Sequence, residues 1–427
     1  METYTQDSFG LLGQKLGHSW SPQIHARFGS TPYVLFEREP DQAEDFIRQG
    51  PWQGINVTIP YKRLAAQCAH TFSSRVERLG VANTLVRQKD GTIFAENTDV
   101  LGFAWLLERF CKRALAQDAR DALNDAEVLI LGSGGACQAV RAAIEDAADC
   151  HVHIVSRTGT TNYENLVERH PTARLIVNTT PVGMYPNCPQ SPLPDETLAS
   201  LHNLQGVIDV VYNPERTSLC IAAERLGIAS ESGLAMLVSQ AFYASQLFQG
   251  KELDESLVDQ VESDLRLSQR NIVLIGMPGA GKTTTGRALA RMLGRPFIDL
   301  DDAFAMDNDM SCACFISTYG EDAFRERESK VAAHYGSRSG LVIACGGGIV
   351  TRAHNYNLLH QNGVIAFIDR PLHELSCNGR PLSQTKGVLK LAEERMDLYR
   401  SWADTAISCT GSAAGDALLL KARLGMA

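Results

Sequence analysis

The sequence predicts an α/β protein throughout, with separate α/β domains along the chain. Two glycine-rich loops, Gly132–Ala139 and Gly276–Thr283, each follow a short apolar run and precede a segment with helical spacing. Further short apolar runs end in polar loops before, between and after them. This order of strand, loop and helix is typical of sheets that bind ligands where their strands end.

Composition sets the broad class. A chain of 427 residues predicts two or three domains, and 44% hydrophobic with 21% charged residues is ordinary for a globular protein. The net charge of −9 and the lack of a basic tract argue against a nucleic-acid partner. We see no signal peptide and no apolar run of membrane length, so we expect a cytoplasmic protein without membrane contact. The 11 cysteines include no C-x-x-C pair, and Cys312-x-Cys314 has no second pair or histidine cluster nearby, so we expect free thiols and no zinc site at these cysteines.

The motifs divide the chain as follows. We expect a substrate-binding and catalytic domain over residues 1–103, completed by a helix at 234–262, and a dinucleotide-binding domain over 104–233. A linker at 263–270 and a phosphate-loop domain over 271–427 complete the order. We expect a monomer or a homodimer.

Residues 9–13 are predicted to form the first strand, and a loop with two nearby hydroxyls follows it. Ser19 and Ser21 lie two residues apart on an extended turn and suit a polyol or carboxylate ligand. Alternatively, Ser21 followed by Pro22 caps the helix that comes next. The residues alone leave both interpretations open.

A β-branched run ends at Pro60, and Lys62 is predicted to begin the next helix. Asn83 and Asp99 come at further loop ends. A lysine paired with a carboxylate can relay a proton to a carbonyl that is being reduced, which is our functional interpretation. A solvated surface lysine is the alternative.

The apolar run at 127–131 leads into a loop of the G-x-G-G-A type, where backbone can approach a pyrophosphate. The next strand, 151–155, ends without the acidic residue expected of an NAD site. A cation and two hydroxyls stand there instead and suit a 2′-phosphate, so we predict NADP(H), with a surface role for the arginine as the alternative. The predicted contacts are Gly132, Gly134, Gly135, Ala136, Ser156, Arg157 and Thr158.

Four motifs in this half resemble the shikimate dehydrogenase family in order and approximate spacing. They are His18-Ser19-x-Ser21-Pro22, Asn56-Val57-Thr58-Ile59-Pro60-x-Lys62, Ala82-Asn83-Thr84 and Asn97-Thr98-Asp99. The resemblance covers about residues 7 to 262. It implies that Lys62 and Asp99 form the catalytic pair and that shikimate contacts Ser19, Ser21, Thr58, Asn83, Tyr212 and Gln240. It also implies cofactor contacts at Gly183, Met184 and Gly233.

One position distinguishes between two branches of the family, and two others depart from its usual pattern. Ser21 in place of threonine resembles the shikimate-preferring branch over the quinate-using one. Glu96 stands where a small residue is usual, and Thr161 stands where a second arginine is often found. We therefore expect fewer cationic contacts to the 2′-phosphate of NADP than in many members of the family.

The second glycine-rich loop fits G-x-x-x-x-G-K-[ST] and predicts a site for ATP. Its backbone N–H groups and the helix that follows form an anion nest. Lys282 would reach the β- and γ-phosphates, and Thr283 would hold Mg²⁺. A glycine-rich turn that binds nothing is the alternative. The predicted nucleotide contacts are Gly279, Ala280, Gly281, Lys282, Thr283 and Thr284.

Later motifs complete a resemblance to shikimate kinase. They are Asp299-x-Asp301, Phe324-Arg325-x-x-Glu328, Gly346-Gly347-Gly348, Arg380-Pro381-Leu382 and Arg395-x-x-x-Tyr399. The resemblance implies Asp301 as the base, Lys282 and Arg380 as stabilisers of the transferring phosphoryl group, and Thr283 with Asp299 as the Mg²⁺ site. It implies that shikimate contacts Asp301, Arg325, Gly347, Gly348 and Arg395. Ala305 and Asp309 depart from the family pattern, and the lid segment 371–380 is short.

These resemblances predict a fusion of two consecutive enzymes of aromatic amino acid biosynthesis. The first half would reduce 3-dehydroshikimate to shikimate with NADPH, and the second would phosphorylate shikimate with ATP and Mg²⁺. Three alternatives are a chain with one inactive half, a non-catalytic ligand sensor built on these folds, and a quinate enzyme in the first half.

Overall fold

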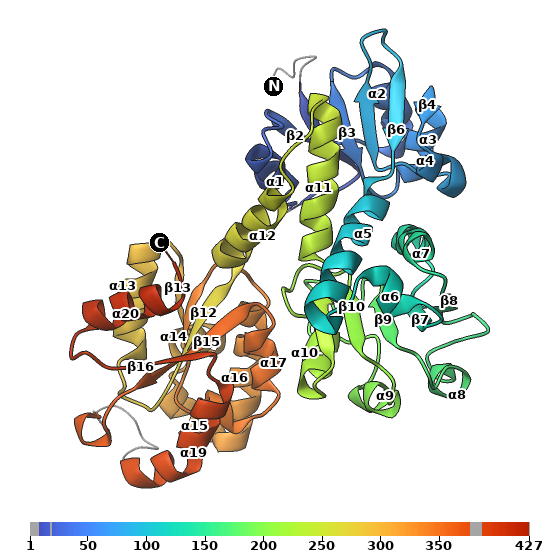
Figure 1. Cartoon of the computed structure of the whole chain (residues 1–427). Helices are drawn as coiled ribbons and strands as arrows, with labels where there is room; N and C mark the ends of the chain where they lie inside the picture. The colour runs from blue at the N-terminus through green and yellow to red at the C-terminus, as the bar shows by residue number, and fades with distance from the viewer. Residues whose placement is uncertain (1–7, 18, 376–386, 427) are drawn as a thin grey trace. The chain divides into compact units, whose positions relative to one another are not determined.

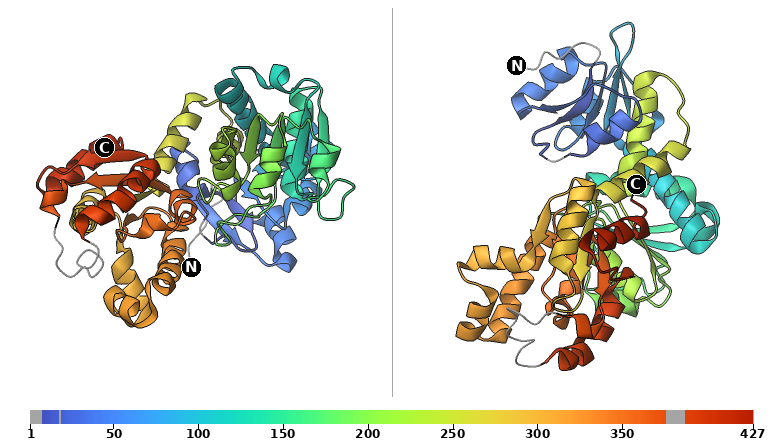
Figure 2. Two further views of the ribbon diagram at one scale, coloured as in Figure 1. Left: turned by 90° about the horizontal axis from the view of Figure 1, so that it is seen from below. Right: turned by 90° about the vertical axis from the view of Figure 1, so that its left-hand side faces the viewer.

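The computed structural model describes residues 8–17, 19–375 and 387–426 (Figures 1 and 2). The chain divides into two compact units. The first contains Met1–Pro181, Pro192–Tyr212 and Ala222–Asp264, and the second contains Val182–Ser191, Asn213–Ile221 and Leu265–Ala427. Within the described residues there are three sheets, and each lies inside one of the three predicted domains. The domain boundaries themselves stay a prediction.

The first sheet is mixed and has the strand order β2-β1-β3-β5-β6-β4. Its strands are β1 (Phe9–Gly13), β2 (Tyr33–Glu37), β3 (Gly54–Val57), β4 (Thr71–Phe72), β5 (Thr84–Arg87) and β6 (Ile93–Glu96). The antiparallel pairs β3–β5 and β5–β6 bring the end of β3, the start of β5 and the end of β6 together. The helices that accompany it are α1 (Ser21–Arg27), α2 (Pro40–Gln49), α3 (Lys62–Cys68) and α4 (Ser74–Leu79).

The second sheet is parallel and has the order β11-β10-β9-β7-β8. Its strands are β7 (Glu127–Leu131), β8 (His151–Val155), β9 (Leu175–Asn178), β10 (Gly206–Asp209) and β11 (Ala229–Ser232). Its helices are α6 (Ala119–Leu123), α7 (Gly135–Ala147), α8 (Leu166–Arg169), α9 (Asp195–Ser200) and α10 (Ser218–Arg225). The strand order reverses between β7 and β9, which is where parallel sheets of this kind bind their ligands.

Two long helices link these sheets, and Figure 1 shows them side by side. They are α5 (Thr98–Phe110), which continues as a π-helical turn over Cys111–Leu115, and α11 (Leu234–Gln249). A Cβ at Gly102 of α5 would lie 2.9 Å from the backbone N and the Cβ of Gln240 on α11. The absence of a side chain at Gly102 therefore allows the two helices to pack closely.

The third sheet is parallel, with the order β13-β14-β12-β15-β16. Its strands are β12 (Asn271–Ile275), β13 (Phe297–Asp299), β14 (Val342–Ala344), β15 (Gly363–Asp369) and β16 (Thr405–Ser408). Its helices are α13 (Lys282–Leu293), α14 (Leu300–Asn308), α15 (Cys312–Tyr319), α16 (Glu321–Gly336), α17 (Asn355–His360), α19 (Val388–Trp402) and α20 (Ala413–Arg423), with 3₁₀ turns at Ile349–Thr351 and Leu372–Glu374. The strands β12 and β15 are almost completely buried, as expected for central strands of a parallel sheet.

Two local predictions were wrong. The single helix predicted over 234–262 is in fact two helices, α11 (Leu234–Gln249) and α12 (Ser256–Gln269), and α12 continues through most of the segment 263–270 that was predicted as a link. The sequence from 256 to 269 contains no proline or glycine, so nothing in it ends the helix at residue 262. Ser21 does not cap α1 either: the N-cap is Trp20, which makes no side-chain cap bond, and Ser21 is the first residue of the helix.

A buried arginine holds three elements of the first unit together. Arg109 on α5 contacts Glu231 of β11 and Asp259 of α12, both at 3.0 Å, and also pairs with Glu262 of α12. The side chains of Arg109 and Glu262 are only 8% and 5% exposed. Removing one partner of a buried ion pair leaves the other charged and desolvated.

We therefore expect Arg109→Met to destabilise the first unit by about 3–5 kcal/mol. Urea unfolding of the full chain, followed by circular dichroism, measures this. Arg113→Met is the matched control, because Arg113 contacts the same Asp259 at 3.2 Å but is 58% exposed. The control should change the free energy of unfolding by less than about 0.5 kcal/mol. Equal effects of the two substitutions would contradict a structural role of the buried charge.

The described residues include no helix that is both long and apolar enough to cross a membrane. In the same residues every cysteine is free.

Candidate active sites

The dinucleotide loop joins β7 to α7 at the point where the strand order reverses. Gly132 has a φ of +100°, a conformation that favours glycine, and its N–H donates to the carbonyl of Val155 at 2.8 Å. Helix α7 then begins at Gly135, so its first N–H groups lie beside the loop. A pyrophosphate fits this arrangement, because the free N–H groups and the helix dipole both favour an anion.

The predicted 2′-phosphate residues form a tight turn directly after β8. The Ser156 N–H donates to the Thr161 carbonyl at 3.1 Å, and Gly159 donates back to Ser156. Arg157 and Thr158 are exposed on this turn. A guanidinium and a hydroxyl that are open to solvent can accept a phosphate without rearranging the core.

The predicted catalytic pair is in contact. Lys62 is the first residue of α3, Asp99 lies in the first turn of α5, and the Lys62 Nζ donates to the Asp99 carboxylate at 2.6 Å. Their side chains are 27% and 17% exposed, so a substrate can reach them. This is the arrangement that a lysine needs to deliver a proton while a carboxylate holds it in place.

Residues predicted to bind substrate lie at the strand ends around this pair. Asn83 is buried just before β5, and its Oδ1 accepts the Thr98 N–H at 2.7 Å, which ties it to the start of α5. Thr58 follows β3, and its N–H donates to the Leu12 carbonyl at 2.9 Å. The hydroxyls of Ser19 and Ser21 lie 3.1 Å apart.

Glu96 does not disturb the charge of this site. It is buried, and its carboxylate accepts bonds from Arg75 at 2.8 and 3.0 Å and from the Ser73 hydroxyl at 2.6 Å. Burial opposes its ionisation, but the bonds from Arg75 and Ser73 hold the pKa of Glu96 below its usual value. The negative charge of Glu96 is therefore paired with the guanidinium of Arg75.

The other predicted residues of this half have defined surroundings. Gln240 on α11 is largely buried and donates to the Leu237 carbonyl at 2.9 Å, and Tyr212 packs against Trp20 with ring centres 5.2 Å apart. A Cβ at Gly233 would lie 2.0 Å from the Val210 carbonyl oxygen, so only glycine fits at this N-cap of α11. Gly183 and Met184 belong to the second compact unit. Contacts of all these residues with substrate or cofactor stay predictions.

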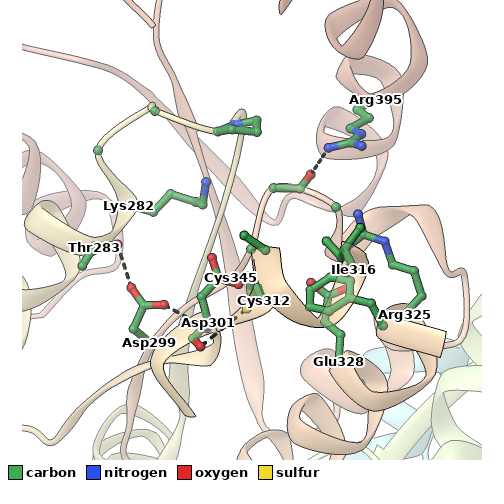
Figure 3. A pocket seen from close by; sticks show the side chains of 18 of the residues that line it. Lys282, Thr283, Asp299, Asp301, Cys312, Ile316, Arg325, Glu328, Cys345 and Arg395 are labelled. Carbon is green, nitrogen blue, oxygen red and sulfur yellow. Dashed lines mark hydrogen bonds and ion pairs between the residues drawn. The ribbon is translucent and has the colours of Figure 1, made fainter. Parts of the chain in front are cut away.

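In the second unit a cavity of about 290 Å³ opens over the phosphate loop (Figure 3). Its lining includes nearly all the predicted residues of this half: Gly279, Gly281, Lys282, Thr283, Thr284, Asp299, Asp301, Arg325, Gly347, Gly348 and Arg395. Ala280 lies within the same loop but is buried beneath it. Arg380 lies outside the described residues.

Hydrogen bonds from Lys282 to the backbone stabilise the conformation of the phosphate loop. Gly281 has a φ of +97° and caps α13. The Lys282 Nζ donates to the carbonyls of Gly276 and Met277, at 2.9 and 3.0 Å, and the side chain lies across the loop. Because this ammonium is buried, phosphate oxygens that replace the carbonyls would gain a strong charge-assisted bond.

Two acids at the end of β13 lie beside the loop. The Thr283 hydroxyl donates to Asp299 at 2.7 Å, which brings together two oxygen donors of the kind that Mg²⁺ prefers. Asp301 retains exposed surface on the cavity, yet the protein atoms around its carboxylate raise its pKa, and Asp299 adds to this effect. Lys282 and Arg325 act in the opposite direction. A carboxylate with a raised pKa is a better proton acceptor.

Sequence reasoning missed Glu328 as part of the site. Arg325 donates to the Glu328 carboxylate at 2.6 Å, and both side chains are about 5% exposed. The sequence did contain a signal for this contact, because Arg325 and Glu328 are three positions apart and such residues are neighbours on the surface of a helix. A Cβ at Gly348 would lie 2.0 Å from the Arg325 guanidinium, so the triple glycine makes room for this arginine. Arg395 donates to the Gly347 carbonyl at 3.1 Å.

The cavity also contains two thiols that were not predicted to contribute, Cys312 and Cys345. Burial raises the pKa of Cys312 to about 12, and Asp301 adds to the effect. The apolar part of the lining includes Ala313, Ile316 and Phe324. Charged and apolar side chains therefore both line the cavity, which suits a small ring carrying polar groups.

The fold and these geometries define a Rossmann-type dinucleotide-binding protein joined to a P-loop domain. The family model "Shikimate dehydrogenase substrate binding domain" matches residues 11–85, and the model "Shikimate kinase" matches residues 278–421. Shikimate dehydrogenase (NADP(+)) of Clostridium perfringens strain SM101 is 30% identical over 279 residues, which cover 60% of this chain and 98% of that relative.

Two solved structures also show similarity to shikimate dehydrogenases. A chorismate mutase/shikimate 5-dehydrogenase fusion protein from Clostridium acetobutylicum has a TM-score of 0.54 and 30% identity, covering 62% of this chain and 97% of its own. Shikimate 5-dehydrogenase from Thermus thermophilus, in complex with NADP(H) and shikimate, has a TM-score of 0.51 and 27% identity, covering 60% and 98%. The chain therefore belongs to the shikimate dehydrogenase family, and a shikimate kinase domain follows its dehydrogenase part.

Proposed function

We propose that the chain is a bifunctional enzyme that reduces 3-dehydroshikimate to shikimate and then phosphorylates shikimate to shikimate 3-phosphate. The contact between Lys62 and Asp99 carries the first activity. The convergence of Lys282, Asp301 and Arg325 on one cavity carries the second. Family membership, and the shikimate and NADP(H) bound by the Thermus relative, support the choice of substrates.

In the reduction, NADPH supplies a hydride to the carbonyl carbon. The Lys62 ammonium donates a proton to the carbonyl oxygen, and Asp99 orients the ammonium at 2.6 Å. Hydroxyls and amides at the neighbouring strand ends hold the ring and its carboxylate. The preference for NADPH over NADH rests on Arg157 and its flanking hydroxyls, because the 2′-phosphate needs a cation.

In the phosphorylation, Asp301 accepts the proton of the attacking 3-hydroxyl, and its raised pKa favours this role. Lys282 stabilises the phosphoryl group in transfer, while Arg325 and Arg395 hold the shikimate carboxylate. Mg²⁺ neutralises phosphate charge, and the Thr283 hydroxyl and Asp299 carboxylate are the groups that would hold it. Arg380, outside the described residues, is proposed to assist Lys282.

Both activities act on small dissolved metabolites, and the free cysteines suit a reducing compartment. We therefore propose a cytoplasmic enzyme that works as a monomer or a homodimer.

One reaction tests the proposal. Purified full-length protein receives 3-dehydroshikimate, NADPH, ATP and Mg²⁺, while NADPH absorbance is recorded and products are identified by mass spectrometry. The expected product is shikimate 3-phosphate, formed more slowly when NADH replaces NADPH. NADPH consumption that stops at shikimate would mean an inactive kinase half. No turnover of either cofactor would favour a ligand sensor, and a faster reaction with quinate than with shikimate would favour the quinate alternative.

A further inference from the structure

Three potential metal ligands gather in the dinucleotide-binding domain, and neither proposed reaction uses them. Glu127 is the first residue of β7, His153 lies on the edge strand β8, and His170 directly follows α8. One ligating atom of each residue lies within 4.8 Å of those of the other two. We propose that these three side chains bind a structural divalent transition metal ion of the Zn²⁺ type.

The distances fit a small tetrahedral ion. The Glu127 Oε1 lies 3.1 Å from His170 Nδ1 and 3.4 Å from His153 Nε2. Zinc binds imidazole nitrogen and carboxylate oxygen at about 2.0–2.2 Å, and two tetrahedral donors at that range are about 3.4 Å apart. The imidazole rings already face each other, with centres 3.9 Å apart. Because a ring nitrogen binds a metal in the plane of its ring, the stacked rings have to turn for both nitrogens to reach one ion.

Burial supports a ligand role for both histidines. His170 is 8% exposed. The Nε2 of His153 is shielded from solvent and, in the part of the chain that the structure describes, makes no hydrogen bond. Its contact with the Glu127 Oε1, at 3.4 Å, lacks hydrogen-bond geometry, and a metal ion between the two atoms would satisfy the nitrogen. The His153 ring as a whole is 32% exposed, which leaves room for water as the fourth ligand.

Neighbouring hydroxyls hold the ligands in orientation. Thr161 Oγ1 lies 3.0 Å from His170 Nε2, so when Nδ1 binds the ion, Nε2–H can donate to this hydroxyl. The Thr172 hydroxyl donates to the second oxygen of Glu127. Supporting partners of this kind are typical of metal ligands, because they fix the tautomer and the ring plane.

A hydrogen-bonded network without metal is the competing explanation. In it, His170 Nδ1–H donates to Glu127 and Thr161 donates to His170 Nε2, which satisfies His170 completely. It leaves the His153 Nε2 at 3.4 Å from the Glu127 carboxylate, without the geometry of a hydrogen bond. The metal site accounts for all three residues at once.

Cobalt spectroscopy distinguishes the metal site from the hydrogen-bonded network without metal. Full-length protein is freed of metal with EDTA, dialysed and titrated with Co²⁺. We expect about one equivalent to give the intense visible bands of tetrahedral cobalt, which Zn²⁺ then abolishes. His153→Gln and Glu127→Gln should remove the bands, and Zn²⁺ should raise the Tm of the wild type but not of these variants. His354→Gln, at an exposed histidine of the other unit, is the matched control and should behave as wild type.

A further variant tests the metal site without removing any of its three proposed ligands. Thr161→Val retains all three ligands but removes the hydroxyl beside His170, and the affinity for Co²⁺ should fall about 10-fold. Circular dichroism in EDTA confirms that each variant is folded. Tetrahedral bands that persist in His153→Gln, bands with the near-ultraviolet signature of thiolate ligation, or no tetrahedral bands in the wild type would each overturn the proposal in favour of the network alone.

Discussion

Replacing Lys282 with methionine is expected to abolish formation of shikimate 3-phosphate while the rate of NADPH oxidation stays at the wild-type value. The substitution keeps much of the side chain's length but removes the ammonium that now bonds to the carbonyls of Gly276 and Met277. Phosphoryl transfer depends mainly on positioned charge, so we expect a loss of at least about 10³-fold in kcat. Supplying shikimate, ATP and Mg²⁺ directly and quantifying the product by mass spectrometry measures this loss.

Lys330→Met is the control for this prediction, because Lys330 lies exposed on α16 of the same unit and outside the cavity lining. It should leave both activities unchanged. The thermal unfolding of the two variants should be compared, so that a collapsed phosphate loop is not mistaken for lost chemistry. A Lys282→Met protein that is folded and still forms shikimate 3-phosphate at more than about a tenth of the wild-type rate would contradict the assignment.

Replacing Lys62 with methionine is expected to have the opposite pattern. The proton donor is lost, and a positioned acid or base contributes about 10²–10⁴-fold, so the kcat of NADPH-dependent reduction should fall by that factor. Phosphorylation of added shikimate should be unchanged, since Lys282, Asp301 and their neighbours lie in the other compact unit. NADPH absorbance and product analysis in the same samples give both rates.

Arg63→Met serves as the neighbouring control, because Arg63 is exposed on the same helix one residue further along. Asp99→Asn should reduce kcat as well, since the amide cannot hold the ammonium by charge. If Lys62→Met lost the kinase activity together with the reductase, the two sites would not be independent, and the simple two-enzyme description would fail.

The strands and the main sites could be predicted because the relevant signals are local. The run at 271–275 is apolar and leads into a glycine-rich loop, so sequence alone located β12, the loop and α13. The contact between Lys62 and Asp99 is not local, since 37 positions separate them. It was predicted through the order of the family's motifs, and the structure brings both residues together at the starts of α3 and α5.

What escaped prediction depends on three-dimensional packing. Ser21 carries a helix-start signal, yet α1 begins one residue earlier than that signal indicates. The carboxylate of Glu328 became part of the site only when α16 turned it toward Arg325. The cluster of Glu127, His153 and His170 has no fixed spacing that a motif could capture, because its members come from two strands and a loop.

The raised pKa of Cys312 determines how the kinase cavity responds to reactive compounds. The raised pKa keeps Cys312 almost entirely in the thiol form at pH 7, and the thiolate is the form that attacks electrophiles. Burial also raises the pKa of Cys345. Alkylating reagents and mild oxidants should therefore modify the exposed Cys314 before either thiol of the cavity. The two sulfur atoms of this pocket are therefore poor targets for a covalent inhibitor.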